Sequence, residues 1–128
     1  MATMEKTCRD VIDKAEWIAI ATSGTEGPHL AGTWGEYVRT LRPANDEVLL
    51  VPVGGYVQTE RNLAADNRIE LLCGTRQVHG AHGPGKGCRI RGTGQIQTSG
   101  ERFETTKGKF PWARGVLVIN IEEVSEQL

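Results

Sequence analysis

The segment VPVGGYVQTERN, in the middle of the chain, combines residue types that can hold a small molecule. An apolar strand is predicted to end there with Pro52 and Val53. The glycine pair Gly54 and Gly55 follows, and a helix is predicted to begin near Thr59. Glycine lets the backbone approach a ligand closely. A hydroxyl at a helix N-terminus lies beside free N–H groups and a positive dipole end, which suit a phosphate. The segment can therefore contact a planar ring at one end and an anion at the other.

A second group of residues supplies positive charge. The basic tract from Arg76 to Arg91 contains no Asp or Glu. Such tracts are more often solvated surface than binding sites, but a nucleotide needs further phosphate donors, because a helix dipole contributes only about 0.3–1 kcal/mol. We select Arg76 and Lys86 as phosphate contacts and expect Arg89 and Arg91 on the solvent-facing side of a strand. The sequence around Lys86, GPGKG, lacks the Walker A pattern and is predicted to be a flexible loop.

Aromatic and histidine residues offer two further possibilities. Trp34 and Trp112 lie next to predicted strand ends and can line a flat ligand, whereas Trp17 is predicted to lie in the core. His79 and His82 are three residues apart without a third ligand nearby, so we interpret them as loop residues rather than a metal site. The chain shows no Ser-His-Asp order and no paired carboxylates. A ligand site without evident catalytic groups favours a protein whose cofactor carries the chemistry.

The composition limits the class of protein. A chain of 128 residues is predicted to form one domain, residues 1–128. Its net charge of -1 argues against a nucleic-acid partner, and no apolar run approaches the length of a membrane span. No signal peptide is visible, so we expect a cytoplasmic protein. Cys8, Cys73 and Cys88 are odd in number and follow no C-x-x-C spacing, which predicts three reduced thiols.

Hydrophobic periodicity predicts a mainly β chain with short helices. Residues 17–34 are predicted to form a hairpin, and residues 88–97 alternate as a half-buried strand does. Segment 36–41 extends the hairpin or forms a third strand. The other predicted elements are strands 47–53, 68–74 and 115–124, helices 5–16, 59–67 and 101–109, and a Gly- and His-rich loop at 76–87. Short strands separated by turns favour a small antiparallel barrel over a doubly wound sheet.

Four segments of the chain resemble one family, the FMN-binding split-barrel proteins that include pyridoxamine 5′-phosphate oxidase. The matching segments are IAIATSGTEGPHLAGTW (18–34), VPVGGYVQTERNLAADNR (51–68), GPGKG through IRG (83–92) and KFPWARGVLVI (109–119). Within the family, the chain is most similar to the small single-domain FMN-binding proteins of anaerobic bacteria. The resemblance implies a six-stranded antiparallel split barrel of Greek-key topology with short flanking helices. It also implies FMN as the cofactor and a homodimer with FMN between the subunits.

The resemblance further implies roles for individual residues. Thr33 and Trp34 would lie near the flavin ring, and Trp112 would flank it. Residues 52–55 would pass their backbone along the ring edge, and Thr59 would bind the phosphate.

Four other positions bear on the same site. Leu128 would reach the flavin of the partner chain. Gln58 stands where relatives often have a basic residue, so it can hydrogen-bond a phosphate but adds no charge. Gly32 stands where relatives can carry Asn, which removes a flavin contact. Lys86 stands where relatives can carry Thr, and we expect its charge to restore what Gln58 lacks.

The main functional hypothesis is a cytoplasmic, homodimeric flavoprotein that binds FMN non-covalently and acts in electron transfer or flavin-dependent redox chemistry. The redox partner is not specified by the sequence. One alternative is an oxidoreductase on a small molecule. Pyridoxamine phosphate is not the expected substrate, because no separate set of basic residues is evident for a second phosphate. The other alternative is a split-barrel module that stores FMN or binds another cofactor such as haem, whose axial ligand would be a His or Cys.

Overall fold

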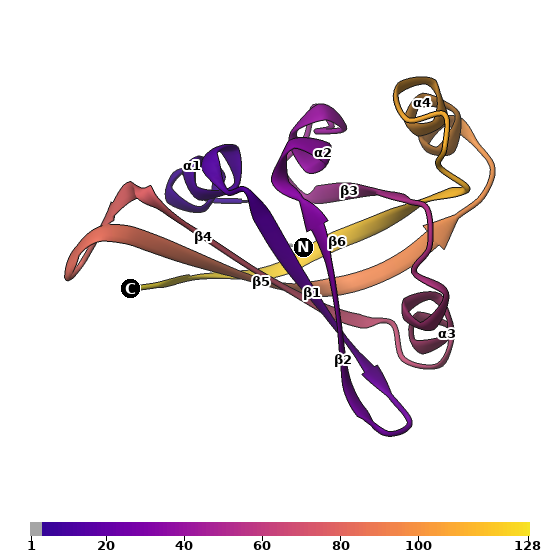
Figure 1. The fold of residues 1–128 in the computed structure, drawn as a ribbon, viewed down its shortest axis with the longest axis horizontal. Coiled ribbons are helices and arrows are strands. Elements are labelled where there is room, and N and C mark those ends of the chain that lie inside the picture. Colours follow the sequence, from indigo (N-terminus) through magenta and orange to yellow (C-terminus); the bar gives the residue numbers. More distant parts are fainter. Residues whose placement is uncertain (1–3) are drawn as a thin grey trace.

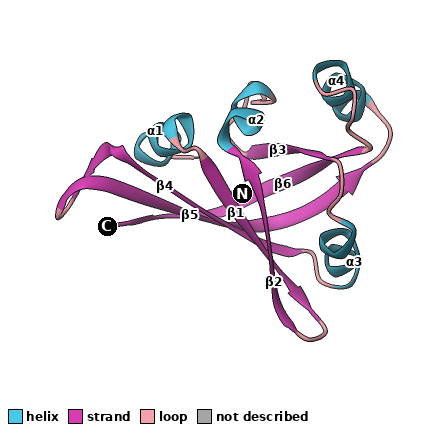
Figure 2. Ribbon diagram, viewed as in Figure 1, coloured by secondary structure: helices cyan, strands magenta, loops and turns pink. Residues whose placement is uncertain are grey.

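The computed structural model describes residues 4–128, which form one curled, antiparallel six-stranded sheet with short helices around it (Figure 1, Figure 2). In the view of Figure 1, α1, α2 and α4 lie along the upper rim of the sheet, and α3 lies below them. The elements, in chain order, are α1 (Lys6–Lys14), β1 (Trp17–Gly24), β2 (Gly27–Trp34), α2 (Gly35–Thr40), β3 (Val48–Val53), α3 (Val57–Ala65), β4 (Arg68–Gly80), β5 (Gly83–Gln97), α4 (Glu101–Lys109) and β6 (Gly115–Gln127).

The strand order confirms the predicted topology. The sheet runs β2-β1-β4-β5-β6-β3, and each neighbouring pair is antiparallel. Strands β4 and β5 form a hairpin, β6 pairs with β5 after the intervening α4, and β3 lies beside β6, which is the strand order of a Greek key. Strands β2 and β3 form the two edges of the sheet and do not pair with each other, so the barrel is open between them. Pro52 lies in the edge strand β3, where a missing backbone donor is tolerated.

Alternating side chains build two apolar clusters. In β6, Leu117, Ile119 and Ile121 belong to the main core inside the curled sheet, as the period-2 pattern predicted. Val116 and Val118 point to the other face and pack in a smaller cluster that Phe103 and Phe110 cover. Full burial of one such side chain contributes about 1.5–3 kcal/mol. Packing on both faces of β3 and of the first half of β6 fixes the strand ends that lie at the candidate site.

Two predicted elements differ from the structure. Segment 36–41 is not a strand, because residues 35–40 form α2. This helix is fixed by contacts outside itself: Val38 is buried, and the Arg39 guanidinium donates hydrogen bonds of 2.9 Å to the carbonyl oxygens of both Ile12 and Ala15, at the end of α1. Six residues are too few for periodicity to distinguish a helix from a strand, so only these tertiary contacts decide the outcome.

The predicted loop at 76–87 is also wrong. Strands β4 and β5 continue through it as a long hairpin, with His79 opposite Pro84 and Gly80 opposite Gly83. Lys86 consequently lies in a strand, opposite Thr75. Glycine and histidine enrichment is typical of loops, but pairing between two long neighbouring strands overrides that local preference.

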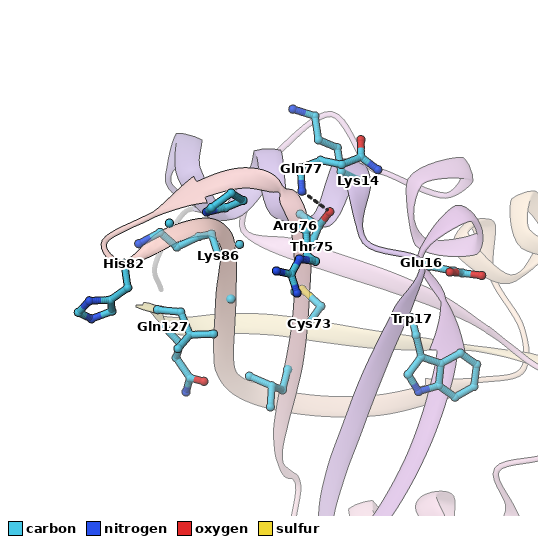
Figure 3. A pocket seen from close by; sticks show the side chains of 17 residues that line it. Lys14, Glu16, Trp17, Cys73, Thr75, Arg76, Gln77, His82, Lys86 and Gln127 are labelled. Carbon is cyan, nitrogen blue, oxygen red and sulfur yellow. Dashed lines mark hydrogen bonds between the residues drawn. The ribbon is translucent and has the colours of Figure 1, made fainter.

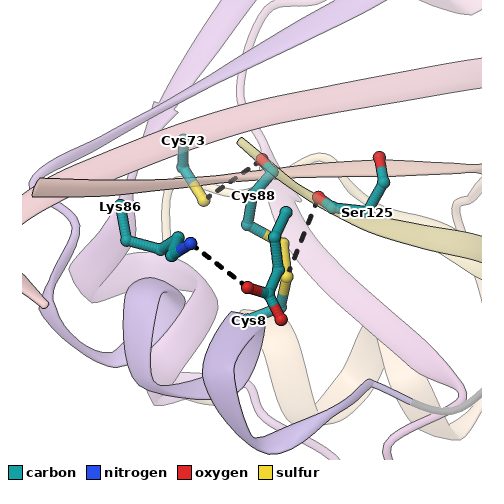
Figure 4. Close-up of a disulfide and its surroundings, with 6 residues drawn as sticks. Cys8, Cys73, Lys86, Cys88 and Ser125 are labelled. Carbon is teal, nitrogen blue, oxygen red and sulfur yellow. Dashed lines mark hydrogen bonds and ion pairs between the residues drawn. A yellow bond between two sulfur atoms is a disulfide. The ribbon is translucent and has the colours of Figure 1, made fainter. Parts of the chain in front are cut away.

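The cysteines correct a third prediction. Cys8 of α1 and Cys88 of β5 form a disulfide, with Cα atoms 5.4 Å apart, and Cys73 is the one free, buried thiol in the described chain (Figure 4). The expected three reduced thiols are therefore replaced by one thiol and one disulfide. Eighty residues separate the paired cysteines in sequence. The packing of α1 across β4, β5 and β6 brings them together, and no short motif records that packing.

Within residues 4–128, no helix is long and apolar enough to cross a membrane.

Candidate functional site

A small cavity lies where β2 and β3 end. Its volume is about 230 Å³. Six of the residues selected from the sequence line it, namely Thr33, Trp34, Pro52, Gly54, Gly55 and Trp112. Trp17, Gly32, Tyr37 and Tyr56 complete the lining. We call this space the ring pocket, because aromatic and glycine residues form most of its wall.

Two tryptophans face the ring pocket from different elements. Trp34 ends β2 and is 47 % exposed, and Trp112 follows α4 and is 51 % exposed. Trp112 packs beside Tyr37, with ring centroids 5.7 Å apart, and its ring lies against Gly54, where a Cβ atom would be 3.2 Å from the indole. Tryptophans this exposed still have apolar faces available for a planar ligand.

Trp17 is not the core residue that was predicted. Its side chain is 49 % exposed, and its ring meets the Trp34 ring edge to face at a centroid distance of 4.8 Å. The β1–β2 register places Trp17 directly opposite Trp34. The predicted hairpin could have indicated this pairing, because its two ends must face each other. Tyr37 and Tyr56 carry no such signal in the sequence and were missed.

The Gly54-Gly55 turn is held by Arg114, a residue that sequence reasoning also missed. The guanidinium donates hydrogen bonds to the carbonyl oxygen of Gly54 (Nε, 3.2 Å) and to that of Gly55 (Nη2, 2.6 Å). The backbone N–H of Arg114 donates to the carbonyl oxygen of Val53 at 2.8 Å. The Val53 side chain is fully buried. Of the residues selected around this turn, Val53 can therefore present only its backbone to a ligand.

Tyr56 connects this turn to β2. It adopts the left-handed conformation (φ 57°) just before α3. Its hydroxyl donates a hydrogen bond of 2.5 Å to the carbonyl oxygen of Gly32. Burial is the main cause that raises the pKa of Tyr56 above its ordinary value, so the phenol keeps its proton and remains a donor. The left-handed residue turns the chain from the edge of the ring pocket into the first turn of α3.

The first turn of α3 is the candidate anion site. Thr59 is 1 % exposed, and its Oγ1 has no hydrogen-bond partner among residues 4–128. A buried hydroxyl without a partner costs about 1–3 kcal/mol, unless a ligand supplies the missing bond. Gln58 is exposed, and its Nε2 donates to Asn62 Oδ1 at 2.8 Å. Asn62 in turn donates to Thr22 Oγ1 at 3.0 Å. A phosphate oxygen fits the unpaired Thr59 hydroxyl and the free N–H groups of this helix terminus.

A larger cavity, of about 880 Å³, lies beside the β4–β5 hairpin (Figure 3). It contains the other selected residues, Arg76, Lys86 and Leu128, and Trp17 lies at its edge. Lys86 is only 12 % exposed and pairs with Glu126 at 3.2 Å. Among the described residues, Arg76 has no carboxylate partner. We call this space the hairpin cavity.

Arg89 and Arg91 lie as predicted, on the outer side of β5. Arg89 pairs with Glu70 at 2.7 Å and Arg91 with Glu123 at 3.3 Å. The tract that contains no acidic residue in sequence is therefore largely neutralised by acidic residues on the neighbouring strands β4 and β6.

Within one chain, Lys86 does not lie near Thr59. Gly94 of β5 lies against Leu63 of α3, and the Gly94 N–H donates to the carbonyl oxygen of Asn67 at 2.8 Å, so this end of β5 is the part of the strand next to α3. Lys86 is eight residues away along the same strand, which corresponds to roughly 25 Å. The expected compensation for Gln58 therefore cannot take place inside a single chain.

The histidines lie apart from the ring pocket. His79 is exposed near the tip of the β4–β5 hairpin, and His82 lines the hairpin cavity. In the part of the chain that the structure describes, no cluster of three His, Cys, Asp or Glu residues could hold a metal ion.

Comparison with known proteins places the chain among relatives. The family model described as pyridoxamine 5′-phosphate oxidase matches residues 4–128. A protein named FMN-binding protein, from Nitratidesulfovibrio vulgaris, is 40% identical over 119 residues, which cover 93% of this chain and 94% of that protein. Two solved structures share the fold at lower identity. HupZ of Group A Streptococcus has a TM-score of 0.71 and 21% identity, over 94% of this chain and 91% of its own.

The second structure is an FMN-binding protein from Syntrophomonas wolfei, with a TM-score of 0.69 and 14% identity, over 96% of this chain and 85% of its own. At such identities the structures establish the fold alone. The family model and the relative at 40% identity together confirm the resemblance found in the sequence motifs. The chain belongs to the pyridoxamine 5′-phosphate oxidase-like family of split-barrel proteins.

Proposed function

We propose that this protein binds FMN non-covalently and acts in electron transfer or flavin-dependent redox chemistry. The observation that carries the proposal is the Thr59 hydroxyl at the start of α3, buried and without a partner among residues 4–128, beside an aromatic-walled pocket. This arrangement offers one place for a planar ring and one for a phosphate. The relative at 40% identity is named an FMN-binding protein, which supports the same cofactor here.

Different residues contact the ring and the phosphate of FMN. Trp34 and Trp112 contact the ring, the backbone of residues 52–55 follows its edge, and Thr59 with the N–H groups of α3 holds the phosphate. Arg114 keeps the Gly54-Gly55 turn in place for this contact. FMN, when bound, supplies the electron-transfer chemistry, while the protein orients it and limits the access of water.

We further propose that two chains share each FMN. Most of the selected residues line one of two separate cavities of the chain, and the start of α3, with Thr59, lies far from the hairpin cavity that contains Arg76. Thr59 and Arg76 can therefore meet one ligand only if two protomers combine. Large exposed apolar side chains favour such an association, because five of them border the two cavities. These five are Trp17, Trp34, Leu72, Trp112 and Leu128. In this homodimer, Arg76, Lys86 and Leu128 of one protomer face the FMN that the other protomer holds.

The cofactor is tested first by an absorbance spectrum of the purified protein and a mass measurement of what it releases. We expect flavin bands and about one FMN per chain. A Soret band would instead favour the haem alternative, and a colourless protein that ignores added FMN would contradict the proposal.

The phosphate site is tested with Thr59→Val, which removes Oγ1 but keeps the shape of the side chain. FMN affinity should fall at least about tenfold, and riboflavin, which has no phosphate, should bind as before. The apoprotein should lose no stability, because the deleted hydroxyl has no partner to lose within residues 4–128. Thr105→Val, on the exposed side of α4, is the matched control. An equal loss for both ligands would show that Thr59 does not contact the phosphate.

The shared site is tested by mixing two variants, Thr59→Val and Arg76→Ala, after dissociation and reassociation. Each mixed dimer contains one site with both defects and one intact site, so about a quarter of all sites should regain tight FMN binding. Sedimentation of the native protein should give twice the chain mass. A monomer, or mixtures without recovery, would contradict the homodimer.

One alternative function has support in the structure. The hairpin cavity has the size of a small-molecule site and contains Arg76, which no carboxylate of residues 4–128 pairs. Where Thr59 and α3 hold the FMN phosphate without Arg76, this arginine is left to bind a second anion. This favours a flavin-dependent oxidoreductase on an anionic small molecule as the second candidate. Steady-state turnover with a nicotinamide donor and a flavin or quinone acceptor separates an enzyme from a carrier.

A further inference from the structure

We infer that Trp17 is an additional wall of the flavin-ring pocket, and that Gly32 is glycine because the Trp17 indole occupies the space of its side chain. This inference rests on the proposed FMN function. It concerns two residues that were interpreted differently from the sequence, Trp17 as core and Gly32 as a lost contact.

Trp17 and Gly32 form a steric interlock across the β1–β2 hairpin, because the indole of one fills the space where the other would carry a side chain. Ala19 lies directly opposite Gly32, and Trp17 lies directly opposite Trp34, so Trp17 is the diagonal neighbour of Gly32 on the same face. A Cβ atom placed on Gly32 would overlap Cζ2 of the Trp17 indole and lie 2.5 Å from its Cε2. No real side chain tolerates such contacts, so any residue larger than glycine at position 32 must displace the indole.

Backbone conformation does not explain this glycine. Gly32 lies within β2, and its φ is outside the left-handed region in which glycine is favoured. Glycine in a strand interior lacks a side chain to pack and often marks a close approach of another group. Here that group is the indole of Trp17, which supplies the apolar surface that residue 32 lacks.

The position of the indole links it to the ring pocket. Trp17 lines the ring pocket, supports the edge of Trp34, and also lines the hairpin cavity. Within one protomer it therefore lies between the two cavities, which in the proposed homodimer belong to different FMN sites. From the other side, Tyr56 binds the Gly32 carbonyl oxygen and holds this part of β2 in place.

The chemical consequence concerns the polarity of the pocket. An aromatic wall contacts the ring and excludes water, but it offers little hydrogen bonding. An asparagine at position 32 offers an amide donor instead. Donors stabilise the negative charge that the ring gains on reduction, whereas an apolar wall does not. We therefore expect bound FMN to have a lower reduction potential beside Trp17 and Gly32 than in a chain with valine at position 17 and asparagine at position 32.

The test is a double-mutant cycle of four proteins: the native chain, Trp17→Val, Gly32→Asn and the double variant. Trp17→Val should weaken FMN binding about fivefold, the size of one lost aromatic contact. Gly32→Asn alone should weaken it more than about tenfold, because the indole is forced out of place. When Trp17→Val is already present, Gly32→Asn should change affinity by less than about twofold, and the FMN potential of the double variant should exceed that of the native protein.

Leu30→Ala is the matched control, because Leu30 is an exposed apolar residue two positions away on β2 that lines neither cavity. It should leave affinity and potential unchanged. Equal effects of Gly32→Asn with and without Trp17→Val would overturn the interlock, and an unchanged potential in the double variant would overturn the ring contact. Denaturant unfolding of the four apoproteins measures the same steric coupling without cofactor. A failure of the FMN proposal therefore appears as absent binding in all four proteins, while the apoprotein cycle still decides the interlock.

Discussion

The guanidinium of Arg114 forms an ion pair with the carboxylate of Glu60, at 3.0 Å, while it also binds the carbonyl oxygens of the Gly54-Gly55 turn. Glu60 lies in the first turn of α3, next to the proposed phosphate site. Its negative charge would oppose a phosphate there, and Arg114 offsets it. One side chain therefore holds the Gly54-Gly55 turn in place and offsets negative charge beside the proposed anion site.

Replacing Arg114 by Ala should weaken FMN binding about tenfold, because the turn loses its hydrogen bonds and Glu60 loses its counter-charge. Stability should fall by only about 1 kcal/mol, since both side chains are partly exposed. Equilibrium dialysis and urea unfolding measure the two effects. Arg68→Ala is the control, because it removes an exposed arginine paired with Asp66 away from the site. If both variants bind FMN equally well, the assigned role of Arg114 is wrong.

Two glycine-to-alanine substitutions should have opposite effects on stability. At Gly92, beside an irregularity in the β5–β6 pairing, a Cβ atom would overlap the carbonyl oxygen of Asn120 and lie 2.9 Å from its carbonyl carbon. Gly92→Ala should therefore destabilise the protein by about 2–3 kcal/mol. Gly108 lies in α4 with no atom near its Cβ position, so Gly108→Ala should stabilise by about 0.5–1 kcal/mol. Thermal unfolding of both variants decides the matter, and a neutral Gly92→Ala would contradict the close approach of β6.

The Cys8–Cys88 disulfide should be detectable by thiol counting. Unfolded under non-reducing conditions, each chain should show one reactive thiol, and after reduction it should show three. Reduction should lower stability by about 4 kcal/mol, from the loop entropy that a cross-link of this span removes. Three thiols without reductant would restore the original prediction. The result also bears on the predicted cytoplasmic location, where reductants usually keep thiols reduced.

Cys73 should give the protein a distinct pH dependence. Burial raises the pKa of this thiol from 9.0 to about 11. Because the folded value exceeds the unfolded one, the associated stabilisation is complete below pH 9 and is lost between pH 9 and pH 11, by about 2–3 kcal/mol. Comparing the native protein with Cys73→Ala across this range isolates the effect from other titrating groups.

The same rise in pKa predicts slow alkylation of the Cys73 thiol. At pH 8 the native thiol should be alkylated about 100-fold more slowly than in unfolded protein, because its thiolate fraction is smaller by that factor. Rapid alkylation of the native protein would show that Cys73 is neither buried nor shifted.

Much of the fold was predictable because its determinants are local. The alternation of β5 and β6, the turn-rich hairpin of residues 17–34 and the helix at residues 101–109 all follow from the spacing of apolar, glycine and polar residues. The glycine pair before α3 marked the candidate site for the same reason. Its neighbours in sequence, Pro52 and Thr59, already contain the contrast between the apolar end of a strand and the hydroxyl at a helix start on which the proposed site depends.

Other features depend on which segments meet in space, and sequence spacing contains no record of that. The disulfide joins residues 80 positions apart, Arg114 reaches the turn from the start of β6, and α2 is fixed by contacts with α1. Trp17 is not a core residue, because its strand pairs it with Trp34 and its indole lies over Gly32. By itself, then, the sequence determined the strands, most of the helices and the chemical types at the site. The tertiary structure decided which side chains share a cavity, because packing and register act between residues that local periodicity cannot relate.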